Sequence, residues 1–172
     1  MFEAVDARTI RYGLGAVKGV GHGACAAIVT ERERSGPFAD LFDFCRRVDA
    51  TKLNKRVLEA LVHAGALDAL GPNRASLMLQ LPEVLKAAEQ LARDRAAGQV
   101  DMFGNASSAA APMTLDLPAC ADWSLEQKLK GERDTLGRYL SGHPLDPYRD
   151  LLRQLASGAL DDLERLHAER KF

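Results

Sequence analysis

Apolar residues recur three and four positions apart along the first half of the chain, which is the spacing of amphipathic helices. This pattern predicts a short helix, a tight glycine hairpin and a longer helix within 11–34, a short helix over 41–48, and a core helix over 53–64. Gly65 suits the left-handed conformation that ends many helices. Pro72 suits the first position of a further helix, which Pro82 should kink or restart before it ends near Ala97.

The pattern changes in the second half of the chain. Between Gly98 and Ala121 alanine, serine and proline dominate and neither a helical nor a strand period survives, which predicts a flexible linker. Helical spacing returns over 123–136 and should end at Gly142-His143-Pro144, and a last helix should run from Pro147 through Leu155. Apart from 9–12, no window alternates as a half-buried strand does. The expected fold class is all-α.

Three parts follow from this pattern. They are a helix-hairpin-helix type helical module over 1–98, a linker over 99–121 and a C-terminal helical segment over 122–172. Met1 runs directly into a patterned segment and the chain stops at Phe172 without an obvious terminal element. We therefore expect a piece of a longer protein.

Composition limits the functions that this chain can have. Its 172 residues are 47% hydrophobic and 27% charged, with a formal net charge of −1, so it has the apolar content for a packed core but is not globally basic. A nucleic-acid site must therefore be focal. The three cysteines, Cys25, Cys45 and Cys120, are far apart and form no metal-ligand spacing, and no apolar run has the length of a membrane span. These features indicate a cytoplasmic protein with reduced thiols and no metal of its own.

The first functional feature is the glycine-rich stretch at 14–28. It resembles the helix-hairpin-helix motif that binds DNA, because glycines let the backbone turn sharply and approach a phosphate while the next helix presents unpaired N–H groups. Val20 should pack inward, and Lys18 adds a positive charge. The expected DNA-binding residues here are Lys18, Gly19, Val20, Gly21, His22 and Gly23. Binding through phosphates should be independent of base sequence and sensitive to salt.

Two alternatives remain for this stretch and its surroundings. The glycines can be a plain interhelical turn in a helical protein-interaction scaffold that makes no direct DNA contact. A free-standing enzyme would need a catalytic set of residues, and the sequence shows none. A second basic group, Lys55, Arg56 and Arg74, can either meet phosphates or be the charged surface of a packing unit.

The second functional feature is Gln99-Val100-Asp101-Met102-Phe103, which lies in the predicted linker. Exposure of the apolar side chains of a Met-Phe pair to water is unfavourable, so such a pair usually binds a partner or packs against another part of the protein. The pattern resembles the pentapeptide by which bacterial proteins bind the sliding clamp, with Gln99, Asp101, Met102 and Phe103 as the expected contacts. The alternative is that Met102 and Phe103 fold back onto the core of this chain.

In order along the chain, these two features resemble one protein family. Together with Leu53-Asn54-Lys55-Arg56, Gly65-Ala66-Leu67-Asp68 and Leu140-Ser141-Gly142-His143-Pro144-Leu145, they look like the alpha subunit of bacterial DNA polymerase III, a replicative C-family polymerase. Val100 departs from the leucine that such clamp motifs often carry.

The resemblance implies duplex DNA, the beta sliding clamp and other polymerase subunits as partners, in a region that precedes an OB domain. It also implies that the two divalent metal ions of the polymerase reaction, expected to be magnesium, belong to a palm domain outside this segment. We therefore expect no catalytic residue and no cofactor here.

Overall fold

The computed structural model describes residues 3–96 and 118–156 and confirms the all-α class. The elements in chain order are strands β1 (Glu3–Ala4) and β2 (Ile10–Arg11), the 3-10 turn η1 (Leu14–Ala16), helices α1 (His22–Ser35), α2 (Leu41–Arg47) and α3 (Lys55–His63), the turn η2 (Asp68–Leu70), helices α4 (Arg74–Ala96) and α5 (Leu125–Leu136), the turn η3 (Asp146–Tyr148) and helix α6 (Arg149–Leu155). The two short strands pair antiparallel, close to the one window in which the sequence allowed a strand.

Local sequence explains where most helices begin and end. The side chains of Asp40 and Asn54 accept hydrogen bonds from backbone N–H groups three residues later, at 2.7 and 2.9 Å, and so cap α2 and α3. Ser124 and Gln127 form a reciprocal capping box at the start of α5. Gly65, which follows the C-cap residue Ala64 of α3, has φ +73°, which confirms the left-handed conformation expected there.

Three boundaries differ from the sequence prediction. α4 begins at Arg74 and not at Pro72, because Asn73 Oδ1 accepts from Ser76 N at 2.8 Å and caps the helix. Pro82 does not restart α4, which continues through it; this proline is exposed, while the leucine before it is fully buried. α5 ends at Leu136, five residues before the expected stop, because Gly137 takes the left-handed conformation at φ +68°.

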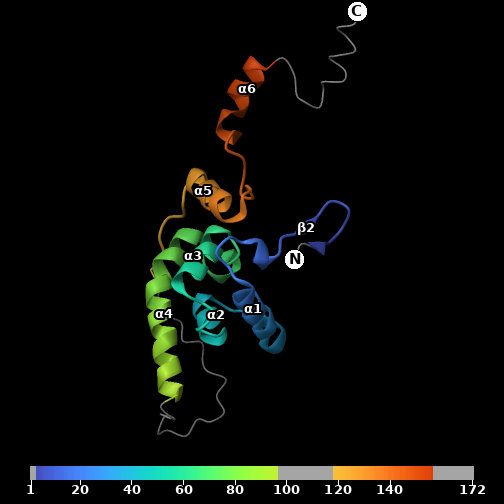
Figure 1. Ribbon diagram of the computed structural model, residues 1–172. Coiled ribbons are helices and arrows are strands. Elements are labelled where there is room, and N and C mark those ends of the chain that lie inside the picture. Colours follow the sequence, from blue (N-terminus) through green and yellow to red (C-terminus); the bar gives the residue numbers. More distant parts are fainter. Residues whose placement is uncertain (1–2, 97–117, 157–172) are drawn as a thin grey trace, which may run out of the picture.

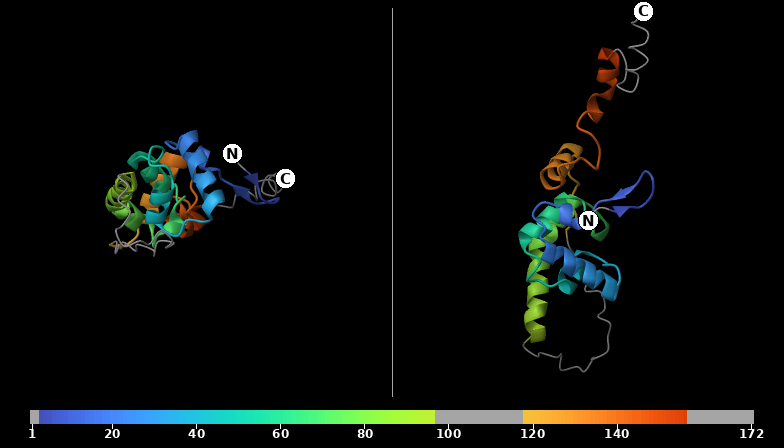
Figure 2. Two further views of the ribbon diagram at one scale, coloured as in Figure 1. Left: turned by 90° about the horizontal axis from the view of Figure 1, so that it is seen from below. Right: turned by 45° about the vertical axis from the view of Figure 1, so that its right-hand side comes forward.

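The core lies between α2, α3 and α4, and α1 and α5 pack around it (Figure 1). Its largest fully buried apolar side chains are Leu41 and Phe44 of α2, Leu58, Leu61 and Val62 of α3, and Leu77, Leu81 and Val84 of α4. The β1–β2 pair and α6 project from this helical body (Figure 2). Accordingly, Leu151, Leu152 and Leu155 of α6 are exposed.

The chain that enters α5 lies against the N-terminal half of α4. Gln80 Nε2 donates to the carbonyl of Pro118 at 3.1 Å, and Ser76 Oγ accepts from Cys120 N at 2.9 Å. Asn73 Nδ2 donates to the Cys120 carbonyl at 2.9 Å. Residues 118–121, the end of the predicted linker, are thus held on α4, because they satisfy polar groups of α4 that would otherwise be buried without partners.

Candidate nucleic-acid interface

The predicted hairpin forms a tight turn between η1 and α1. Val17 and Val20 are buried and anchor its two sides, as expected for Val20, and Val20 N donates to the Val17 carbonyl at 3.1 Å. Between them Gly19 has φ +94°, a conformation that glycine adopts without strain. Lys18 and Gly19 are exposed. The two valines therefore fix the hairpin from inside while its tip faces solvent.

Gly21 occupies the N-cap position of α1, a helix of 14 residues. Glycine has no side chain that could cap the helix, so the first N–H groups of α1 lack the usual side-chain acceptor. The φ of Gly21 is −74°, which any residue can adopt, and a Cβ there would meet no atom of the described residues within 4 Å. Neither backbone conformation nor packing within the described residues requires this glycine, and the space in front of the helix N-terminus is open.

His22 and Gly23 are also exposed in the first turn of α1. A Cβ placed on Gly23 would lie 3.7 Å from Cδ of Lys52, a residue of the loop between α2 and α3. Lys52 therefore brings a second cation beside the N-terminus of α1. Sequence reasoning missed it, because 29 positions separate it from Gly23 and no motif links the two.

Lys55 and Arg56 are exposed in the first turn of α3, as the prediction of a basic surface requires. Cations are unfavourable at a helix N-terminus, although Lys55 lies 3.7 Å from Glu59 one turn later in α3. Arg56 lies one turn before Ala60, whose Cβ is 3.7 Å from the position of a Cβ on Gly19. The structure thus brings α3 directly behind the hairpin.

Arg74, the third basic residue expected to meet phosphates, is not on the surface. Its side chain is 8% exposed, and Nη1 lies 2.9 Å from Oε1 of Glu132, which is fully buried. Asp68 accepts two further bonds at 2.9 Å, from Nε and Nη2. The prediction that Arg74 binds DNA is therefore wrong, because both of its charged partners come from elements that fold over it.

The C-terminal turn of α5 contacts the chain on both sides of η1. Lys18 N donates to the Thr135 carbonyl at 2.8 Å, and Tyr12 Oη donates to the Leu136 carbonyl at 3.2 Å. α5 itself packs on α3, where His63 stacks on Trp123 with ring centroids 4.9 Å apart. The hairpin thus rests on a helix that lies more than 100 residues away in sequence.

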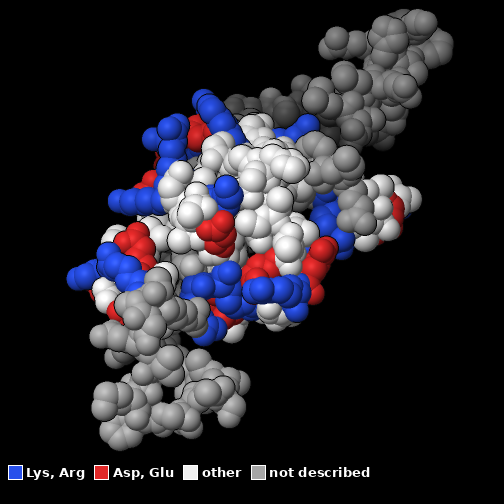
Figure 3. Space-filling model, turned by 60° about the horizontal axis from the view of Figure 1, so that its bottom comes forward, with Lys and Arg blue, Asp and Glu red and all other residues white. Residues whose placement is uncertain are grey.

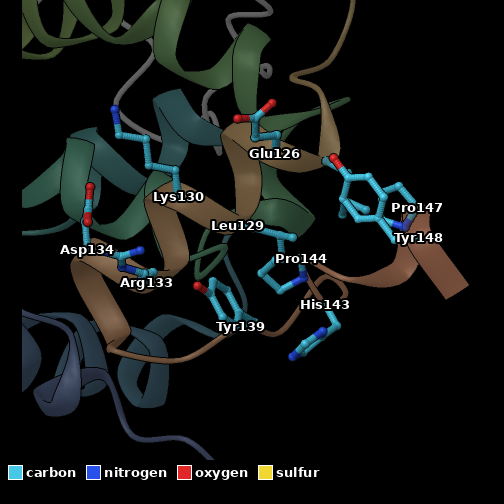
Figure 4. Close-up of a pocket in the computed structure, with 11 residues that line it drawn as sticks. Glu126, Leu129, Lys130, Arg133, Asp134, Tyr139, His143, Pro144, Pro147 and Tyr148 are labelled. Carbon is cyan, nitrogen blue, oxygen red and sulfur yellow. The ribbon is translucent and has the colours of Figure 1, made fainter. Parts of the chain in front are cut away.

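The molecule has no broad surface of one charge on the face shown in Figure 3, where Lys and Arg side chains alternate with Asp and Glu around an uncharged area. A pocket of about 500 Å³ lies elsewhere, between α5 and the segment that follows it. Tyr139, His143 and Tyr148 line it together with Lys130, Arg133 and Asp134 of α5 (Figure 4). Opposite charges share this pocket, so it offers no uniform attraction to phosphates.

Gln99, Asp101, Met102 and Phe103 lie outside the described residues, so the clamp-binding motif stays a prediction. Among the described residues no group of three or more His, Cys, Asp or Glu side chains could hold a metal ion. Within the same residues no helix has the length and apolarity to cross a membrane.

Comparison with known proteins gives a family for this sequence. A model of the helix-hairpin-helix motif matches residues 2–77. The chain is 57% identical over 168 residues to the DNA polymerase III subunit alpha of Xylella fastidiosa strain Temecula1, with 96% of this chain and 14% of that protein covered. It is 45% identical over 163 residues to the Escherichia coli K12 subunit of the same name, with 94% and 14% covered.

The chain thus spans about one seventh of the length of these relatives. The helix-hairpin-helix match contains the hairpin, α2, α3 and the start of α4. This chain belongs, as a segment, to the family of bacterial DNA polymerase III alpha subunits.

Proposed function

We propose that the chain holds duplex DNA by its phosphate backbone, with Lys18, Gly19, Gly21, His22 and Gly23 in contact and Lys52, Lys55 and Arg56 adding positive charge. The observation that carries this proposal is the exposed, uncapped N-terminus of α1 behind Gly21, beside two lysines. Unpaired N–H groups and the positive end of the helix dipole both favour an anion there. Val20 supports the hairpin from within, because its side chain is buried.

Titration of fluorescent duplex DNA, followed by anisotropy at low and moderate salt, tests this proposal. Wild-type binding should weaken as salt rises, because each phosphate contact releases counterions. Gly21→Glu should abolish binding, since its carboxylate occupies the approach to the helix N-terminus and repels phosphate. Lys18→Glu should weaken binding for every base sequence alike and lower the slope of log K against log salt by about one.

Lys86→Glu is the control matched to Lys18→Glu, because it also replaces a lysine by a glutamate, at an exposed position of α4 outside the hairpin. It should leave the affinity within about twofold of wild type. Equal binding by wild type and folded Gly21→Glu would show that the hairpin is a structural turn, and the chain would then be a helical interaction scaffold without direct DNA contact.

We further propose that Gln99 to Phe103 bind the beta sliding clamp. The support is the Gln-x-x-Met-Phe pattern and the family of the chain; a short motif outside the helical module suits a partner that is engaged and released. Met102→Ala with Phe103→Ala should abolish complex formation with the clamp in surface plasmon resonance and leave the helical circular dichroism unchanged. Retained clamp binding by this double variant would refute the proposal.

In the longer relatives this segment would hold the duplex and the clamp during DNA replication in the cytoplasm, alongside other polymerase subunits. We propose that the nucleotidyl transfer itself, and the metal ions that it requires, lie in other parts of such a protein. The chain would then contribute affinity for the substrate duplex and for the clamp without a catalytic group.

A further inference from the structure

We propose that the buried pair of Arg74 and Glu132 positions the hairpin for its DNA contact, acting through α5. Neither side chain can reach the nucleic acid, because Glu132 is fully buried and Arg74 is 8% exposed. This inference rests on the DNA-binding function proposed above. It gives Arg74 a part in that function, although not the phosphate contact expected from the sequence.

Glu132 joins α5 to two other parts of the chain. Its carboxylate accepts from Arg74 Nη1 at 2.9 Å, from Ser141 Oγ at 2.5 Å and from the backbone N–H groups of Leu140 and Ser141 at 2.6 and 3.0 Å. Arg74 begins α4, and residues 140 and 141 follow the end of α5. The carboxylate therefore fixes α5 both to the start of α4 and to the chain that leaves α5.

The same end of α5 holds the hairpin. The carbonyls of Thr135 and Leu136, three and four residues after Glu132, accept from Lys18 N at 2.8 Å and from Tyr12 Oη at 3.2 Å. Lys18 is at once the residue anchored on α5 and the cation proposed to meet a phosphate. A rotation or shift of α5 would move Lys18 and the N-terminus of α1 relative to each other, and phosphate binding needs both in place.

A purely structural role makes a different prediction. Removing one partner of a buried ion pair costs stability wherever the pair lies. Glu31 of α1 belongs to such a pair: it is 7% exposed and pairs with Arg47 and Arg34. Glu31 lies in the second half of α1, away from α5. Glu132→Gln and Glu31→Gln thus each remove one buried negative charge, but only the first removes a contact of α5.

The experiment measures duplex DNA affinity of the 172-residue chain and amide hydrogen exchange of Lys18, at a temperature where each variant is folded by circular dichroism. Glu132→Gln should weaken binding about fivefold and speed exchange of the Lys18 amide, because the Thr135 carbonyl is no longer held in place. Glu31→Gln should stay within about twofold of wild type and leave this amide protected. Tyr12→Phe, which removes the hydrogen bond to the Leu136 carbonyl of α5, should weaken binding in the same direction.

Each result decides the inference. Wild-type affinity in folded Glu132→Gln overturns it while the proposed DNA binding stands. Should Glu132→Gln not fold, unchanged affinity in Tyr12→Phe overturns it. Equal weakening by Glu31→Gln also overturns it, since a general loss of stability then explains the effect. Absence of salt-dependent binding by the wild type refutes the proposed function itself, and the positioning role with it.

Discussion

Single residues in this chain show how tertiary surroundings change a side chain's role. His63 is half-buried and stacks on Trp123, and its Nδ1 is buried and has no hydrogen-bond partner among the described residues. Gly131 of α5 lies against it: a Cβ there would be 2.8 Å from Nδ1. The imidazole thus fills the contact between α3 and α5 as a flat ring.

The stability of the chain should therefore depend on pH through His63. Burial lowers the pKa of His63 below its usual 6.5; Arg74 lowers it as well, and Glu59 and Asp134 oppose the shift. The unfolded chain takes up a proton near pH 6.5, whereas the folded chain does so only at lower pH. The free energy of unfolding should fall as pH drops below about 6.5, by at most about 1.4 kcal/mol per pH unit for one proton.

Urea unfolding at pH 7.5 and 5.5 measures this dependence. His63→Phe keeps a ring on Trp123 but cannot titrate, so the difference between the two pH values should shrink. His22→Gln, at an exposed position of α1, should retain the wild-type difference. A full difference in His63→Phe would assign the pH dependence to other groups.

At the level of elements, α4 shows packing overriding a local signal. Pro82 removes one backbone hydrogen bond and clashes with the preceding turn, so the sequence favours a kink or a restart. α4 nevertheless continues, because Leu77, Leu81 and Val84 on both sides of the proline are fully buried against the other helices. The hydrophobic gain from these side chains exceeds the cost of one interrupted turn.

Replacement of Pro82 by alanine should therefore stabilise the chain. The exposed position accepts a methyl group, and the restored N–H can donate to the carbonyl of Met78. We expect the free energy of unfolding to rise by about 1 kcal/mol or more, measured by urea denaturation. Glu83→Ala, at the next exposed position, is the control and should change it by less than about 0.5 kcal/mol. A loss of stability in Pro82→Ala would mean that the proline sets a bend on which the core depends.

At the scale of the whole molecule, one core unites residues from both sides of the 97–117 interval. Leu136 of α5 belongs to the same buried cluster as the side chains of α2, α3 and α4, and the α5 carbonyls hold the hairpin. With a net charge of −1, attraction to DNA cannot come from the molecule as a whole. The proposed DNA binding depends instead on a few cations and on the N-terminus of α1, and α5 keeps the hairpin that carries them in position.

The sequence alone determined the all-α class, the order of the helices and most of their ends. These follow from forces between near neighbours, such as the apolar spacing over 53–64 and the glycine cap at 65. The exposed hairpin with its inward Val20 could be predicted for the same reason, because glycine conformation is a local property.

The tertiary structure decided which charged residues reach the surface. Nothing in the sequence distinguishes Arg74 from the exposed cations Lys55 and Arg56. In the structure Arg74 is buried, because it pairs with Glu132, 58 positions away. Lys52 joins the hairpin only because the loop before α3 folds beside α1. Such pairings depend on how distant elements pack, and the balance between desolvation and ion pairing that settles them exists only once the core has closed.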